Sequence, residues 1–139
     1  MLSDYVHIPE STIKSWFSPQ KIDSGNPVYP RLSTLDKLCD ALEIHTSDLF
    51  ILTSDFSHPY ISNNNSLKAF QYNFNRICLE KGLASANSRI NYLFFDEDTY
   101  TRKELFYSYL RNDPARIIPI PRLDMIAMRL DVETYELLL

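Results

Sequence analysis

The stretch LDKLCDALEIHTSDL, residues 35–49, is matched in spacing by LDMIAMRLDVETYEL, residues 123–137. In each stretch apolar residues recur at intervals of three and four, which places them on one face of an α-helix. The matching positions are Leu35, Leu38, Cys39, Leu42, Ile44 and Leu49, and then Leu123, Ile126, Ala127, Leu130, Val132 and Leu137. Any two amphipathic helices share part of this pattern, but here the order and the spacing agree throughout. We therefore interpret the two stretches as a duplicated helical unit.

Helical periodicity also extends between the two copies. SLKAFQYNFNRICLEKGL, residues 66–83, predicts a long helix that Gly82 would end. Shorter helices are expected at residues 87–95 and 101–110, the second beginning at Thr101 because Thr101 and Glu104 have the spacing of a capping box.

The remaining segments predict helix starts and connections. Ser33 is the expected N-cap of the first repeated helix. The polar, proline-containing residues 57–65 predict a linker, and the proline-interrupted residues 117–121 predict a loop.

Composition excludes several classes of protein. The formal net charge is −4, and all of it lies in residues 1–56, because residues 57–139 carry equal numbers of acidic and basic side chains. The only two glycines, Gly25 and Gly82, are too far apart to form a glycine-rich phosphate loop. No apolar run approaches the roughly 20 residues that span a bilayer, and the N-terminus does not resemble a secretory signal. Cys39 and Cys78 are therefore expected to be reduced, buried thiols of a cytoplasmic protein with no membrane contact.

Chemistry at a metal or a catalytic nucleophile is not expected. His7, His45 and His58 have no histidine or cysteine at metal-ligand spacing. Serine, histidine and aspartate occur without the sequence context of a nucleophile elbow. We predict no catalytic residues, no metal, no cofactor and no enzymatic activity.

The motif LSDYVHIPESTIKSW, residues 2–16, resembles the helix-turn-helix of the lambda-repressor-like (Cro-type) family. In this resemblance His7 takes the turn position, while Ile8 and Ile13 anchor two short helices. The later segment LSTLDKLCDALEIHTSDLF, residues 32–50, resembles the fourth and fifth helices of the same family. The resemblance implies that a polar helix edge meets base edges and phosphates. Its DNA-facing residues would be Glu10, Ser11, Thr12, Lys14, Ser15, Lys21 and Arg31.

Residues 66–139 resemble the same fold more weakly, with the helix at 101–110 in the place of the third. Arg102, Lys103 and Tyr107 would then face outward, and Arg111 and Arg116 would follow in the loop, where the family often contacts phosphate. The basic group Arg102, Lys103, Arg111 and Arg116 could bind DNA or an acidic partner. Three carboxylates, Asp96, Glu97 and Asp98, stand beside this face and would repel phosphate.

The resemblance implies an all-α fold with two tandem helix-turn-helix-type bundles. Residues 1–56 would be the first unit, 57–65 the linker, and 66–139 a divergent second unit. The first unit is expected to lack its first helix, since only Met1 precedes Leu2.

Two functions follow from this fold. The first is a transcriptional regulator of phage or bacterial repressor type that reads a short operator in double-stranded DNA as a homodimer, because one recognition helix reads too few bases. The alternative is a helical protein-interaction module that has lost DNA binding, such as a phage inhibitor of a host factor or an antitoxin-like partner. The acidic charge and the carboxylate turn favour the alternative.

Overall fold

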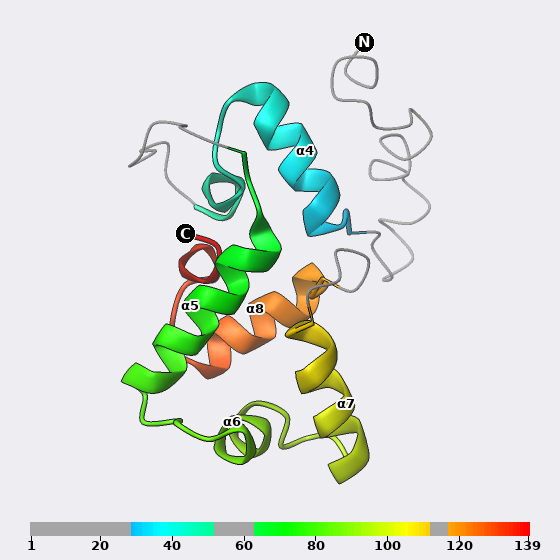
Figure 1. The fold of residues 1–139 in the computed structure, drawn as a ribbon, viewed down its shortest axis with the longest axis vertical. Helices are drawn as coiled ribbons and strands as arrows, with labels where there is room; N and C mark the ends of the chain where they lie inside the picture. Colours follow the sequence, from blue (N-terminus) through cyan, green and yellow to red (C-terminus); the bar gives the residue numbers. More distant parts are fainter. Residues whose placement is uncertain (1–28, 52–62, 112–116) are drawn as a thin grey trace.

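The computed structural model describes residues 29–51, 63–111 and 117–139, and all the regular structure in these ranges is helical (Figure 1). No strand occurs among the described residues, which confirms the all-α class. In chain order the elements are the α-helices α4 (Leu32–Leu42), α5 (Ser66–Glu80), α6 (Ala86–Leu93), α7 (Thr99–Tyr109) and α8 (Ile120–Arg129), with the 3₁₀ helices η1 (Thr46–Phe50) after α4 and η3 (Thr134–Leu137) after α8.

The two copies of the repeated stretch have the same local structure where the helix ends. Just beyond α4, Glu43 adopts a left-handed backbone with φ of 56°, and beyond α8 Asp131 does so with φ of 57°. The next residue of each copy, Ile44 or Val132, donates its backbone N–H to a carbonyl five residues earlier, at 3.0 Å in both copies. These bonds satisfy carbonyls that the helix end would otherwise leave unpaired.

The start of the 3₁₀ helix is also repeated. The backbone N–H of His45 donates to the Asp48 carboxylate at 3.2 Å, and that of Glu133 donates to the Glu136 carboxylate at 2.6 Å. Each acidic side chain reaches back across one turn to the residue that precedes η1 or η3. The sequence repeat therefore corresponds to a repeated helix, left-handed turn and 3₁₀ helix.

The two copies lie together, because η1 packs against η3 while α4 and η3 both pack against α5 (Figure 1). Leu32 and Leu35 of α4 belong to the same apolar cluster as Phe70, Leu123 and Leu137. Residues on both sides of the predicted linker thus share one core.

A buried polar junction joins α4, η1 and the start of α5. The Asp36 carboxylate accepts hydrogen bonds from the hydroxyl of Ser66 at 2.5 Å, the backbone N–H of Ser66 at 2.9 Å and the hydroxyl of Thr46 at 2.6 Å. Ser66 and Thr46 are each only 2% exposed. A buried polar group without a hydrogen-bond partner lowers folding stability by about 1–3 kcal/mol. These hydrogen bonds therefore favour the arrangement in which α4, η1 and the start of α5 are in contact.

The end of the predicted linker is attached to the same junction. Asn64 donates its side-chain amide to the Asp40 carboxylate at 2.9 Å and to the carbonyl of Ile44 at 2.8 Å. It also accepts the backbone N–H of Thr46 at 2.8 Å. The neighbouring Asn65 caps α5 by accepting the backbone N–H of Lys68. Residues 64–65 are therefore part of the folded structure.

Two predicted helix starts are each wrong by two residues. Arg31, and not Ser33, is the N-cap of α4. α7 begins at Thr99 and not at Thr101, because Asp98 is its N-cap. The Asp98 carboxylate accepts both the backbone N–H of Thr101 at 2.9 Å and its hydroxyl at 2.8 Å. Thr101 therefore serves as a donor to the cap.

Other predicted boundaries agree more closely with the structure. α5 ends at Glu80, and Gly82 has a φ of +80°, which confirms its role in ending this helix. The segment 117–121 is a loop only as far as Pro119, because α8 starts at Ile120. Pro121 fits there, since the first turn of a helix has no partner for the N–H that proline lacks.

Replacing Glu43 or Asp131 with glycine should stabilise the fold. A side chain in the left-handed region costs roughly 1–2 kcal/mol, and the greater freedom of glycine in the unfolded chain offsets part of the gain. We expect each change to raise the free energy of unfolding by about 0.5 kcal/mol in urea titrations followed by circular dichroism. Lys37→Gly, at an exposed position inside α4, is the control and should lower it by about 1 kcal/mol. A loss of stability at positions 43 and 131 would contradict the repeated left-handed turn.

Candidate nucleic-acid interface

The residues predicted to face DNA fall into two groups, according to whether the structure describes them. Arg31, Arg102, Lys103 and Arg111 are placed by the structure. The first helix-turn-helix motif and one loop arginine lie outside the described residues, namely Glu10, Ser11, Thr12, Lys14, Ser15, Lys21 and Arg116.

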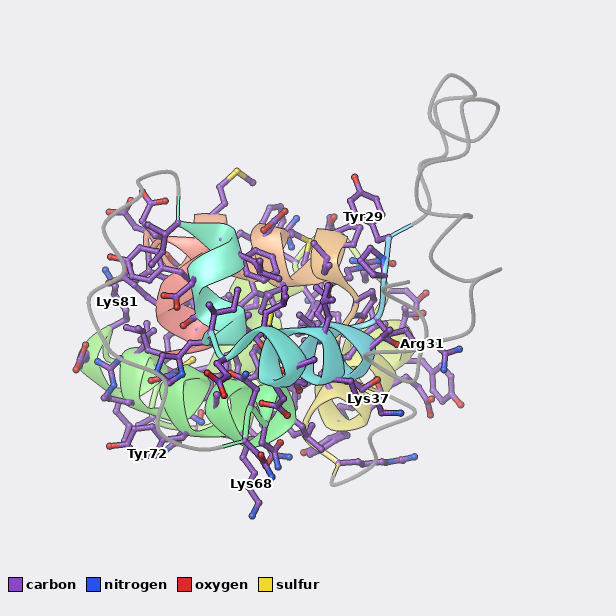
Figure 2. The ribbon with its side chains drawn as sticks, turned by 90° about the horizontal axis from the view of Figure 1, so that it is seen from above. Tyr29, Arg31, Lys37, Lys68, Tyr72 and Lys81 are labelled. Atoms are coloured by element: carbon purple, nitrogen blue, oxygen red, sulfur yellow. The ribbon has the colours of Figure 1, made fainter. Side chains whose placement is uncertain are left out.

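Arg31 lies at the start of α4, where its side chain is exposed (Figure 2). A cation at this end of a helix is not stabilised by the helix dipole, which favours negative charge there. Arg31 makes no ion pair with any described residue. Its guanidinium can therefore bind an external phosphate without breaking an internal contact.

The outward face of α7 carries aromatic and basic side chains together. Tyr100, Lys103, Glu104, Tyr107 and Arg111 line a hollow of about 260 Å³. Tyr100 is 74% exposed and Tyr107 is 50% exposed, so both rings are open to a partner. The hydrogen bond from Tyr100 to the Glu104 carboxylate raises the pKa of Tyr100. Tyr100 precedes the helix that the sequence predicts from Thr101, whereas the structure places it in the first turn of α7.

Arg102 points its guanidinium back toward the protein. It donates to the carbonyl of Glu97 at 2.6 Å, to the carbonyl of Phe95 at 2.7 Å and to the side chain of Asn91 at 3.4 Å. The two carbonyls belong to the turn between α6 and α7, and Asn91 lies in α6. Arg102 thus ties this turn to α7, which periodicity alone could not indicate.

The three carboxylates of the same turn are each bonded within the protein. Asp96 pairs with Arg129 at 3.1 Å, and Glu97 pairs with Arg122 at 3.2 Å. The hydrogen bond from Arg129 holds the pKa of Asp96 below its usual value. The backbone N–H at the start of α7 does the same for the pKa of the Asp98 cap. The negative charge of the turn is therefore matched by two arginines and a helix N-terminus.

Arg129 has further contacts that fix its position. It donates to the carbonyl of Leu93, and its guanidinium carbon lies 4.5 Å from the centre of the Phe95 ring. A cation at this distance is attracted to the face of the ring. Arg129 therefore connects α8 to the end of α6.

The described residues offer little for other kinds of chemistry. They contain no group of three or more histidine, cysteine or acidic side chains that could hold a metal ion. Both cysteines are buried free thiols, and burial raises the pKa of Cys39 and of Cys78 to about 11. Within the same ranges no helix combines the length and the apolar character needed to cross a bilayer.

Residues 2–55 match the family model of the Cro/C1-type HTH DNA-binding domain. This segment is therefore similar to Cro/C1-type HTH DNA-binding domains. The match confirms the resemblance inferred from residues 2–16, and it includes α4 and η1. It covers less than half of the chain and ends before α5. Searches of curated proteins and of solved structures returned no match.

The match supports a DNA-binding regulator in general, because the family is defined by DNA binding. Within the described part of the matched segment, Arg31 is the only predicted DNA-facing residue. The basic face of α7 lies outside the match.

The different roles of Arg102, which donates hydrogen bonds within the protein, and of exposed Lys103 can be tested by comparing the stability of two variants. Arg102→Ala should lower the free energy of unfolding by about 1–2 kcal/mol, because two carbonyls lose a charged donor. Lys103→Ala, at the next residue of the same helix, should change it by less than about 0.5 kcal/mol. Urea unfolding of both variants gives the comparison. Equal stability of the two variants would show that Arg102 does not hold the turn.

Proposed function

We propose that the protein is a transcriptional regulator of phage or bacterial repressor type, which binds a short operator in double-stranded DNA as a homodimer. The observation that carries this proposal is the match of residues 2–55 to the Cro/C1-type HTH DNA-binding domain. A homodimer is proposed because two recognition helices on adjacent half-sites supply the selectivity that one helix lacks. The proposal includes no catalytic step and no cofactor, and it places the protein in the cytoplasm with DNA.

In this function the polar edge of the second motif helix reads the bases, through Ser11, Thr12, Lys14 and Ser15, with Glu10 at its start. Lys21 and Arg31 bind backbone phosphates and fix the orientation of the domain. Arg31 is exposed at the start of α4 and makes no ion pair with any other described residue, which supports this role.

The alternative is a helical module that binds a protein. Two sequence features favour it, namely the acidic charge of the chain and the three carboxylates of residues 96–98. The contacts of these carboxylates weaken the second argument. Asp96 and Glu97 are paired with arginines, and Asp98 caps α7. We therefore favour DNA as the partner.

A salt titration of DNA binding tests the proposal. We expect the full chain to bind genomic DNA fragments, and the logarithm of its binding constant to fall linearly with the logarithm of salt concentration, as phosphates are neutralised. Fluorescence anisotropy gives the constants, and analytical ultracentrifugation with a selected fragment gives the stoichiometry. Absence of binding even at about 50 mM salt would contradict the proposal.

The double variant Lys14→Ala/Ser15→Ala identifies the reading helix. It should abolish selection of a preferred fragment from the genomic pool while leaving the melting temperature nearly unchanged, because exposed helix positions tolerate substitution. Lys81→Ala, an exposed position beyond α5, is the control and should keep selection. A large loss of melting temperature in the double variant would place these side chains in the core and contradict their assignment.

A further inference from the structure

Two exposed tyrosines form a stripe along α7, a helix at the edge of the described structure (Figure 1). Within α7 only Phe106 and Tyr109 are buried, and Tyr100 and Tyr107 are exposed on the other side. A helix that faces only water usually carries charged residues at such positions, whereas tyrosine is enriched where proteins contact one another. The stripe therefore has the composition of a contact surface.

One cation and one carboxylate flank the two tyrosines. An α-helix turns by about 100° per residue, so Tyr100 and Tyr107 lie within about 20° of each other around the helix axis. By the same geometry Lys103 lies about 60° to one side of Tyr100, and Glu104 lies about 40° to the other side. All four side chains line one hollow of the surface. The stripe thus has an aromatic centre, a positive flank and a negative flank.

Both flanking charges can reach a partner. Lys103 is exposed and makes no hydrogen bond or ion pair with any other described residue. Glu104 accepts a hydrogen bond from Tyr100, but a carboxylate has about four acceptor sites and can accept a further donor. The neighbouring Arg102, by contrast, donates to two carbonyls of its own chain. The charges of the stripe are therefore Lys103 and Glu104.

This pattern is complementary to itself under a two-fold rotation. When two copies of α7 lie side by side and parallel, the two-fold axis runs along the helices, and the positive flank of each helix meets the negative flank of the other. Lys103 then faces the partner's Glu104 at nearly the same level, and each tyrosine meets its own counterpart. In an antiparallel pair the axis is perpendicular to the helices, so flanks of like charge meet and repel. The charges therefore select the parallel arrangement.

The charges at the two ends of α7 are compatible with a parallel pair. The acidic turns that precede the two helices would approach each other, but their negative charge is compensated. Asp96 pairs with Arg129, and Glu97 pairs with Arg122. Arg111 follows the C-terminal end of α7, where the helix dipole favours a cation.

We propose that α7 is a homodimer contact, in which the stripe of Tyr100, Lys103, Glu104 and Tyr107 pairs in parallel with the same stripe of a second copy. The proposal rests on the homodimer of the proposed function and names the surface through which that homodimer forms. The 3₁₀ helices η1 and η3 do not offer an equivalent surface, because they pack against each other within one chain. A contact through one helix of each copy is small, so the free dimer is weak, and two adjacent half-sites on DNA tighten it.

Charge variants of the full chain test the pairing. Sedimentation equilibrium without DNA gives the dissociation constant of the dimer. Lys103→Glu makes both flanks negative and Glu104→Lys makes both positive, so we expect each variant alone to dimerise roughly tenfold more weakly. An equimolar mixture of the two variants should recover the constant of the unchanged chain, and so should the double variant Lys103→Glu/Glu104→Lys. Since residues i and i+1 of a helix do not face each other, this recovery reports a contact between chains. Absence of recovery would overturn the proposal.

A pair of tyrosine variants provides a matched control. Tyr100→Ala/Tyr107→Ala removes the aromatic centre of the stripe and should weaken dimer formation roughly tenfold. Tyr72→Ala/Tyr92→Ala removes two other exposed tyrosines and should leave the constant unchanged; Tyr72 points outward from α5 in Figure 2. Equal effects of the two double variants would overturn the proposal. Melting temperatures show that each variant is folded.

The results distinguish this contact from the proposed function. If the chain dimerises and no α7 variant changes the constant, the α7 contact is refuted while the proposed homodimer stands. If the α7 variants lose pairing but the salt titration shows no binding to DNA, the α7 contact stands and the proposed function fails. A chain that stays monomeric both alone and on DNA would leave the stripe to another protein and overturn the proposal.

Discussion

The Asp36 carboxylate is the group on which the arrangement of the described chain depends. It lies where α4, η1 and the first residue of α5 meet, and it accepts hydrogen bonds from the nearly fully buried Ser66 and Thr46. Replacing Asp36 with an apolar residue would leave the buried donors of Ser66 and Thr46 without their acceptor. Such a loss costs several kcal/mol, a large part of the stability of a small domain.

This junction has a consequence for how the two parts of the chain are arranged. It fixes α4 and η1, which lie within the segment that matches the Cro/C1-type HTH family model, on the helical part that follows them. The contact between η1 and η3 then brings the two copies of the repeated segment together, and their apolar residues enter one core.

Much of the fold could be predicted from the sequence, because it depends on local patterns. The repeat of apolar residues around Leu35 and Leu123 predicted α4 and α8, and Gly82 marked the end of α5. The helix-turn-helix resemblance of residues 2–16 was confirmed by the family match. The inward course of Arg102 and the pairing of the acidic turn could not be predicted, since they depend on carbonyls and arginines brought close only by the fold.

Native-state hydrogen exchange tests the central claim that α4 shares one cooperative core with the helices that follow it. The slowest amides of α4 and those of α5 and α8 are compared in increasing denaturant. The account predicts the same opening free energy and the same denaturant dependence for all three helices, because Asp36 and the shared apolar cluster make them unfold together. Exchange of α4 through a separate opening of lower free energy, with α5 and α8 still protected, would contradict it.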